Sequence, residues 1–425
     1  MVFKEIFVKR INTFLIFGLF CLPLQLLTGA ENKKSVPTSG EIAKPNAAID
    51  TVSDHKDEQE STHEDRKTYN KQTVNKFIFK DNHLGISGYM DAYGVYSFNN
   101  LSENKQRPYN SNPLYMDEFG FSYGFISFEY ENENVRARVS IHGGELVERM
   151  YVGERPMYKM FREANAGYLF SKQVSLEMGI FPSIYGSETF INKDNQHATR
   201  AIMTDFAPDY MAGVRLNYEP TEHWDLKLEV TNGWQTLSNP EHQKNLGALV
   251  VYEQQGKFLI NWGTYLGNEA KPNEVARIRS YHNLFAKIFL WRFIFLPMAD
   301  IYIEKRNAEA RTVTAFNLGL SIRYAIADKW GIAARYERLY DPDEINPDLK
   351  ANNPYGKEDP ALPAPTPSGF QADGYTLTLE YLPSSHLTMR LEGRYTESKS
   401  PIYIRDAHQP TRTDSFIYSS IAVGF

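Results

Sequence analysis

The chain has 425 residues and a formal net charge of −6 at pH 7; 42% of its residues are hydrophobic and 14% are aromatic. The negative charge argues against a nucleic-acid binder that relies on a basic surface. Many aromatic residues with modest hydrophobic content are unusual for a soluble enzyme and typical of a transmembrane β-barrel, whose strands expose only every second residue to lipid.

The first segment, residues 1–30, has the three parts of a secretory signal. The opening "MVFKEIFVKR" is positively charged, an apolar stretch follows, and Thr28 and Ala30 hold the small positions before a cleavage site. A retained anchor is the alternative, but the apolar stretch is shorter than the roughly 20 residues of a spanning helix. We therefore expect secretion and removal of this segment.

The next segment, residues 31–80, is polar and carries a mixed block of charges at 54–67. It has too little apolar surface to fold on its own, so we expect a disordered periplasmic leader. The one cysteine of the chain, Cys21, lies in the expected signal, so the mature chain would contain no disulfide.

From residue 84 onward the hydrophobic pattern has a period of two, which is typical of β-strands. In "VRARVSI", for example, Val135 and Val139 alternate with Arg136 and Arg138. Such stretches predict an all-β, antiparallel up-and-down barrel of about sixteen strands within 84–425, with enough residues per strand to cross a bilayer. The expected strands are 84–99, 118–131, 134–146, 160–171, 174–183, 208–219, 223–233, 245–254, 256–267, 278–289, 291–304, 313–327, 329–340, 371–383, 386–398 and 414–425.

The most apolar stretch after the signal is 284–303, which a spanning helix could also explain. Lys287, Arg292 and Asp300 would each be costly in the middle of a lipid-embedded helix. Pro297 would interrupt its hydrogen bonding. Two strands joined by a tight turn near residue 290 are therefore the preferred interpretation.

The expected connections alternate in length along the chain. Short turns are expected near Asn132, Lys172, Thr221, Gln255, Leu290, Asp328 and Ser384. The longer connections are 100–117, 147–159, 184–207, 234–244, 268–277, 305–312, 341–370 and 399–413. Outer-membrane barrels have short periplasmic turns and long outer loops, so this order predicts that both termini are periplasmic.

The chain ends in "SSIAVGF", with Phe425 last and Ile417, Ile421 and Val423 on the same strand face. A closed barrel must pair its last strand with its first, because an open edge is not tolerated in lipid. This ending resembles the signal that the barrel-assembly machinery of bacteria recognises, so we expect that machinery as a partner through Phe425.

Several long stretches resemble the putative β-barrel porin-2 (OmpL-like) family. The likeness lies in "GISGYMDAYGVYSFNN" (85–100), in "YNSNPLYMDEFGFSYGFISFEYENENVRARVSIHGG" (109–144) and in the region 179–235, and it fades toward the C-terminus. The resemblance implies a barrel in the bacterial outer membrane, surrounded by its lipid. It implies no particular substrate or binding residue.

If the apolar strand faces meet lipid, the charged faces line the lumen. The expected pore-lining residues are Arg136, Arg138, Glu177, Arg215, Glu219, Lys227, Glu229, Arg323, Arg335, Glu337, Glu380, Arg390, Glu392 and Arg394. Charges in this number are costly in a dry core, and sixteen strands enclose a lumen wide enough for water. The sequence therefore predicts a porin-like channel for passive diffusion of small hydrophilic solutes or ions.

The third long connection, 184–207, is expected to narrow this channel. The expectation rests on a resemblance to sixteen-stranded porins, in which the loop at this place folds inward; an outward loop is the alternative. Its charged residues would set charge selectivity: Glu188, Lys193, Asp194, Arg200 and Asp205. The same resemblance suggests a homotrimer.

Two other functions stay open from the sequence. A barrel enzyme, such as a hydrolase, would pair a histidine with a serine or carboxylate near one rim; the candidates are His142, His197, His242 and His282. No local motif supports them, and we expect no enzyme. A structural or adhesive barrel, plugged by pairing among its lumen charges, is the main alternative to a channel.

We expect no cofactor and no bound metal. Asp341, Asp343 and Glu344 open the longest loop and could offer oxygen ligands to Ca²⁺. Acidic residues at this spacing are common in solvated loops, so they do not predict a site.

Overall fold

The computed structural model describes residues 77–78, 83–100, 107, 112–238, 244–270, 273–343, 345, 369–406 and 409–425. All of them belong to one compact unit, Lys56–Phe425. The expected signal, 1–30, and most of the expected leader, 31–80, lie outside the described residues. The short strand β1 (Phe77–Ile78) falls at the end of that leader range and pairs with Gly85 and Ile86.

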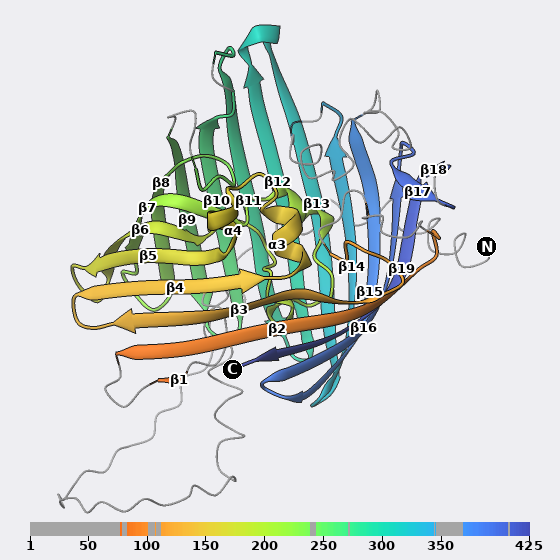
Figure 1. The fold of residues 1–425 in the computed structure, drawn as a ribbon, viewed down its shortest axis with the longest axis horizontal. Coiled ribbons are helices and arrows are strands. Elements are labelled where there is room, and N and C mark those ends of the chain that lie inside the picture. The colour runs from red at the N-terminus through yellow and green to blue at the C-terminus, as the bar shows by residue number, and fades with distance from the viewer. Residues whose placement is uncertain are drawn as a thin grey trace, which may run out of the picture. The chain divides into compact units, whose positions relative to one another are not determined.

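Sixteen antiparallel strands form a closed barrel, as the period of two predicts (Figure 1). They are β2 (Leu84–Ser97), β3 (Phe119–Glu131), β4 (Val135–Gly143), β5 (Phe161–Leu169), β6 (Val174–Pro182), β7 (Tyr210–Tyr218), β8 (Trp224–Thr231), β9 (Asn245–Gln254), β10 (Phe258–Asn268), β11 (Arg277–Leu290), β12 (Phe293–Arg306), β13 (Arg311–Ala327), β14 (Trp330–Asp341), β15 (Phe370–Ser384), β16 (Leu387–Ser398) and β19 (Thr413–Gly424). Each strand pairs with its sequence neighbours, and β19 pairs with β2 to close the sheet.

The strand boundaries agree closely with the sequence pattern. The largest difference is in the third strand, expected to end at 146 and ending at Gly143. The hairpin in 284–303 is confirmed: β11 and β12 pair around a turn at Trp291 and Arg292, where Trp291 has a positive φ of 54°.

One connection differs from the expected alternation of lengths. The loop expected at 305–312 runs only from Asn307 to Ala310 and contains the 3₁₀ turn η3 (Asn307–Glu309). Pairing continues to Arg306 and Arg311 at the ends of β12 and β13, so residues expected in a loop extend the two strands instead.

The other long connections carry small elements: α3 (Glu145–Met150), α4 (Pro156–Lys159), η1 (Asn192–Asp194), η2 (Ile202–Phe206), β17 (Tyr403–Arg405) and β18 (Gln409–Thr411). Within the described part of the chain, no helix has the length and apolar character needed to cross a membrane.

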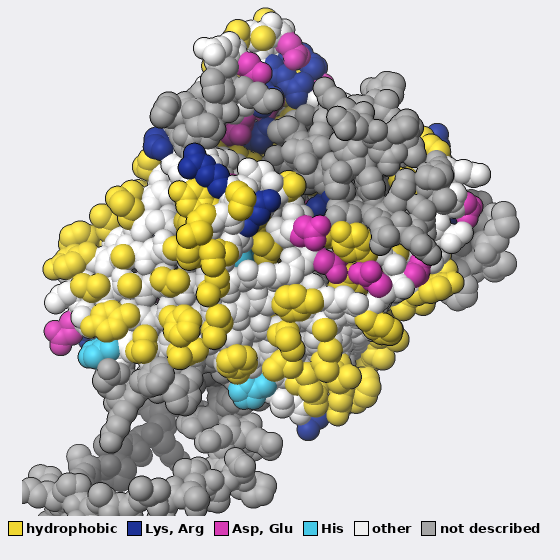
Figure 2. Space-filling model, in the orientation of Figure 1, with side chains coloured by type: hydrophobic (Ala, Val, Ile, Leu, Met, Phe, Trp, Pro, Cys, Tyr) yellow, Lys and Arg dark blue, Asp and Glu magenta, His cyan; other side chains and the backbone are white. Residues whose placement is uncertain are grey.

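The outer surface of the barrel is apolar between two levels of aromatic residues. On β14–β16 the row Ile332, Leu379 and Leu391 is flanked by tyrosines on one side and by Trp330 and Tyr381 on the other. Figure 2 shows hydrophobic side chains spread over the visible face, with charged side chains gathered mainly toward its upper part. This is the surface that a lipid bilayer requires.

The strands on one side of the barrel are much shorter than those on the other. Strands β4–β7 have nine residues each and β8 has eight, whereas β12 has 14 and β13 has 17. About 9–11 residues are needed for a tilted strand to cross a bilayer, so β4–β7 are at the lower limit of this range and β8 is just below it.

Candidate functional site

The lumen is divided by the segment that joins β6 to β7, residues 183–209, which we call the inner loop. It reaches into the barrel and contacts strands far from its own ends. His197 lies 2.7 Å from Ser321 Oγ on β13 and 2.7 Å from Thr378 Oγ1 on β15. The Tyr185 hydroxyl donates to the carbonyl of Thr264 on β10 at 2.9 Å. The inner loop therefore bridges the lumen to the opposite wall.

Glutamates of that wall accept hydrogen bonds from the inner-loop backbone. Glu392 accepts from the N–H groups of Ala198 at 2.7 Å and Thr199 at 3.1 Å, and Glu337 accepts from the N–H of Ile202 at 2.6 Å. Such bonds to an ionised group are stronger than bonds between neutral partners.

Arginines of the same wall donate to the inner-loop carbonyls. Arg390 donates to the carbonyls of Asn192 and Asn195, both at 2.6 Å. Arg394 donates to the carbonyl of Arg200 at 2.7 Å, and Arg335 to that of Thr199 at 3.0 Å. The inner loop thus has both its N–H and its C=O groups held by charged side chains.

These contacts correct part of the expected pore lining. Arg335, Glu337, Glu380, Arg390, Glu392 and Arg394 do face inward, but none is more than 4% exposed. They lie beneath the inner loop, where ion pairs and hydrogen bonds to its backbone take the place of the expected water. Arg323 belongs to this ionic group, because it donates to Glu380 at 2.8 Å.

The inner loop also makes apolar contacts with the barrel wall, in addition to the ion pairs. Inner-loop side chains Ile202, Met203 and Phe206 pack in one buried cluster with inward residues of β9–β14, among them Leu249 and Tyr302. The expected pore-lining charges did not reveal this apolar part of the inner surface. The wall from β9 to β16 is instead sealed, partly by an apolar core and partly by ion pairs.

On the wall from β3 to β8, two arginines stay within reach of water, although most of the other charged side chains of this wall are buried. Arg136 is 29% exposed and pairs with Glu131 at 2.7 Å and with Glu177 at 3.0 Å. Arg138 is 34% exposed and pairs with Glu163 at 3.0 Å.

The other expected residues of this wall are also paired, with one exception. Arg215 pairs with Glu229, and Lys227 with Asp225. Glu219 was expected on the lumen wall but lies in the exposed turn after β7, because that strand ends at Tyr218.

The charged inner-loop residues have different surroundings. Glu188 pairs with Arg335 at 2.9 Å, deep in the sealed half. Arg200 pairs with Asp205 at 3.5 Å and with Asp209 at 2.5 Å, and its guanidinium lies 4.7 Å from the Phe190 ring centre. Lys193 and Asp194 lie half-buried on η1.

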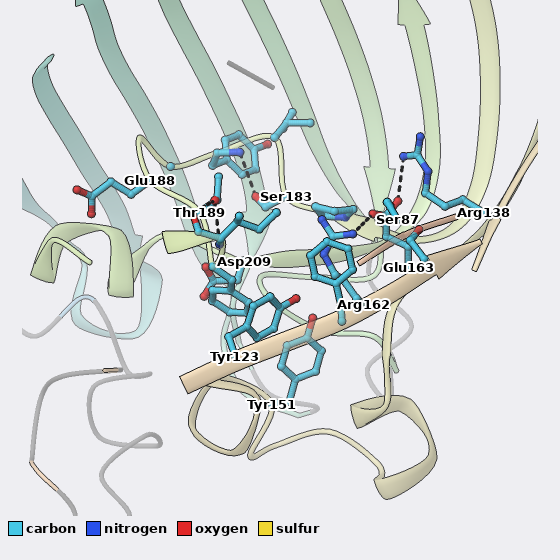
Figure 3. A pocket seen from close by; sticks show the side chains of 18 of the residues that line it. Ser87, Tyr123, Arg138, Tyr151, Arg162, Glu163, Ser183, Glu188, Thr189 and Asp209 are labelled. Carbon is cyan, nitrogen blue, oxygen red and sulfur yellow. Dashed lines mark hydrogen bonds and ion pairs between the residues drawn. The ribbon is translucent and has the colours of Figure 1, made fainter. Parts of the chain in front are cut away.

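A cavity of about 340 Å³ remains between residues 183–191 of the inner loop and strands β3–β8 (Figure 3). Arg138, Arg162 and Glu163 line its strand side, and Asp209 lies where the inner loop meets β7. Burial raises the pKa of the Asp209 carboxyl to about 7, against the opposing effect of Arg200. The cavity is thus a polar space beside the sealed half of the lumen.

Sequence reasoning missed Arg162. The pairing of β4 with β5 shifts between Ser140 and Ile141, so β5 carries an extra residue there. The shift leaves Arg162 and Glu163, which are adjacent in sequence, both buried. A β-bulge re-aims side chains in this way, and a strict period of two does not reveal it.

The histidines are held by structural contacts. His142 lies 3.1 Å from the Tyr123 hydroxyl and 3.1 Å from the Lys159 carbonyl, and His282 lies 3.2 Å from Ser280. His197 is completely buried. His242 is outside the described residues.

The acidic residues of the longest loop are also engaged. Asp343 pairs with Arg311 at 2.7 Å, and Asp341 accepts the N–H of Ile345 at 2.8 Å. Glu344 is outside the described residues. Among the residues that the structure describes, no group of three or more His, Cys, Asp or Glu could hold a metal ion.

A closed sixteen-stranded barrel with an inner loop after its fifth strand defines the class of porin-type barrels. The fold is similar to the anion-selective porin of Comamonas acidovorans (TM-score 0.53, 9% identity, covering 80% of this chain and 99% of that one). It is also similar to OmpF of Salmonella typhi (TM-score 0.53, 13% identity, 83% and 100%) and to the outer-membrane channel DcaP of Acinetobacter baumannii (TM-score 0.52, 11% identity, 83% and 100%).

The sequence comparison is more specific than the fold. The model of the family "putative beta-barrel porin-2, OmpL-like" matches residues 83–425, so the chain belongs to this family and is a porin-like protein of the bacterial outer membrane. No curated protein matches the sequence.

Proposed function

We propose that small hydrophilic solutes cross the outer membrane passively through the half of the lumen lined by β3–β8. The observation that carries this proposal is the polar cavity beside the inner loop, which is lined by the partly exposed Arg138 and by its buried partner Glu163. The sealed wall from β9 to β16 leaves the path off-centre, so the channel is narrow.

The plugged structural barrel is less consistent with this arrangement. A plug would need to fill the lumen on all sides, whereas the inner loop binds mainly one wall and leaves the cavity on the other.

An enzymatic role has one superficially suitable group of residues. His197 lies beside Ser321 and 3.9 Å from Glu392, which resembles the spacing of a nucleophile with its base. His197, Ser321 and Glu392 are all completely buried. Ser321 and Glu392 hold the inner loop in place, Ser321 through His197 and Glu392 through the loop backbone. We therefore propose that the protein is not an enzyme.

Planar-bilayer recording tests the channel. We expect the purified barrel to give discrete, ohmic current steps, because water and ions can pass along the β3–β8 wall. A folded barrel, shown by heat-modifiable migration on gels, that gives no steps at high protein load would contradict the proposal and favour the plugged barrel.

We further propose that both termini face the periplasm and that residues 1–30 and 31–80 are the signal and a periplasmic leader. Within the barrel, His83 accepts the N–H of Glu131 at 2.9 Å, and Gly424 donates to His386 at 2.9 Å, so the first strand begins and the last ends beside short turns. The Phe425 N–H donates to Gly88 on β2, and its exposed ring is the contact we propose for the barrel-assembly machinery.

Cysteine labelling tests this orientation. A cysteine at Ser385, in a short turn, should react with a membrane-impermeant reagent only after the outer membrane of intact cells is permeabilised. A cysteine at Asn307, in the opposite connection, should react without permeabilisation. Labelling of both from the same side would contradict the proposed topology.

We also propose that the short wall, formed by the eight- and nine-residue strands β4–β8, is covered by further copies of the chain in a homotrimer. An apolar groove of about 470 Å³ runs over the outer face of β6–β10, and Leu216, Leu228 and Leu246 lie exposed along it. A neighbouring barrel would both fill this groove and cover strands at the lower length limit for crossing a bilayer.

A further inference from the structure

The cavity beside the inner loop contains an arginine that the fold places there specifically. Arg162 is the additional residue of the β-bulge in β5, and only 6% of its surface is exposed. Its guanidinium stacks 4.3 Å from the Phe125 ring centre and pairs with Glu163 through Nη1. The bulge and the stacking hold the guanidinium at the cavity wall (Figure 3).

Three buried polar atoms of the residues that line this cavity have no hydrogen-bond partner among the described residues: Arg138 Nε, Arg162 Nη2 and Asp209 Oδ2. Arg162 Nη2 is a donor and Asp209 Oδ2 is an acceptor. Arg162 and Asp209 lie near the same two tyrosines, because the charges of both act on the hydroxyls of Tyr123 and Tyr151. Buried polar atoms are normally satisfied, so Arg162 Nη2 and Asp209 Oδ2 together suit a ligand that accepts one hydrogen bond and donates another.

The charges of the cavity lining balance. Its basic residues are Arg138, Arg162, Arg215 and Lys227, and its acidic residues are Glu129, Glu163, Glu188 and Asp209. Most of them are already engaged in ion pairs, such as Arg138 with Glu163. The lining therefore has no net attraction for a solute of either sign, and a fully charged solute would have to displace an existing ion pair.

The cavity also offers aromatic surfaces. Tyr123, Tyr151 and Phe190 line it, and the rings of Tyr123 and Phe190 meet edge to face with centres 5.2 Å apart. The volume is at the small end of the range of about 300–1,000 Å³ for ligand pockets.

We propose that this cavity is a transit site for a small neutral polyhydroxylated solute, of the size of a monosaccharide. Sugar hydroxyls both donate and accept, so one solute satisfies Arg162 Nη2 and Asp209 Oδ2 without disturbing the ion pairs. The C–H faces of the sugar ring pack on the aromatic side chains. This inference rests on the proposed channel, because the solute must pass through the lumen to reach the cavity.

The test is a sugar titration of the ion current. In 1 M KCl, glucose should reduce the current through the unaltered channel in a saturable manner. Arg162→Met and, separately, Asp209→Ala should each weaken this block about tenfold or more, because each removes a hydrogen bond to a charged group. Arg136→Met is the matched control: it removes an arginine that is ion-paired outside the cavity, so the block should persist.

The outcomes separate the sugar site from the channel. Current steps that respond to glycine or phosphate but not to glucose would overturn the sugar site and leave the channel standing. An equal loss of block in R162M and R136M would also overturn it, because the effect would then be one of general charge. Absence of any current steps in the folded protein would overturn the channel itself.

Discussion

Replacement of Glu392 by alanine should produce larger and noisier single-channel currents. Glu392 accepts the N–H groups of Ala198 and Thr199 and also bonds Thr378, so it is central to the attachment of the inner loop. Bonds to charged groups contribute roughly 1.5–3 kcal/mol each, and their loss would loosen the inner loop around residues 198–199 at the β14–β16 wall. Water would then enter the half of the lumen that is now sealed.

The matched control for this change is Glu397→Ala. Glu397 lies on the same strand but on the outer face, so its removal should leave the conductance unchanged. Single-channel recording of the two variants, with heat-modifiable migration as the check on folding, measures the difference. Equal currents in E392A and the unaltered protein would contradict the assignment of Glu392 as an anchor.

Replacement of Leu228 by arginine should dissociate the proposed homotrimer. Leu228 is 58% exposed on β8 and lies in the apolar groove of the short wall. An arginine there would place charge in the proposed contact between barrels. It would also cost the barrel about 2–4 kcal/mol if it lies near the bilayer midplane.

Leu391→Arg separates these two effects. Leu391 is 53% exposed on β16, across the barrel from β8, and should carry a similar cost in lipid without changing the assembly. Native gels or light scattering of both variants in detergent would show the oligomeric state. A loss of oligomer in L391R and not in L228R would place the interface on the opposite wall.

The strands were predictable from sequence because lipid imposes a simple pattern on them. In β16 the alternation of Met389 and Leu391 with Arg390 and Glu392 correctly separates the outer from the inner face. The sealed half was not predictable in the same way. Arg390 and Glu392 bind backbone groups of the inner loop as well as neighbouring side chains, and side-chain periodicity contains no information about a distant backbone.

Two further features had weaker signals. The stretch "NLGALVVYEQ" in β9 has apolar residues on both faces, and such a run indicates burial on both sides. Leu249 and Val251 of this strand pack inside the barrel. The bulge at Arg162 had no signal, because pairing with a neighbouring strand determines its position.

The attachment of the inner loop has a consequence for how this protein can change over evolutionary time. The wall arginines and glutamates bind mostly N–H and C=O groups, which are present whatever side chains the loop carries. Side chains can therefore change at loop positions that the wall holds only through the backbone, provided that the chain keeps its path and the side chains that bind or pack inside, such as His197 and Phe206. The same barrel wall can therefore hold inner loops of different sequence, so the selectivity of the channel can diverge while the barrel stays constant.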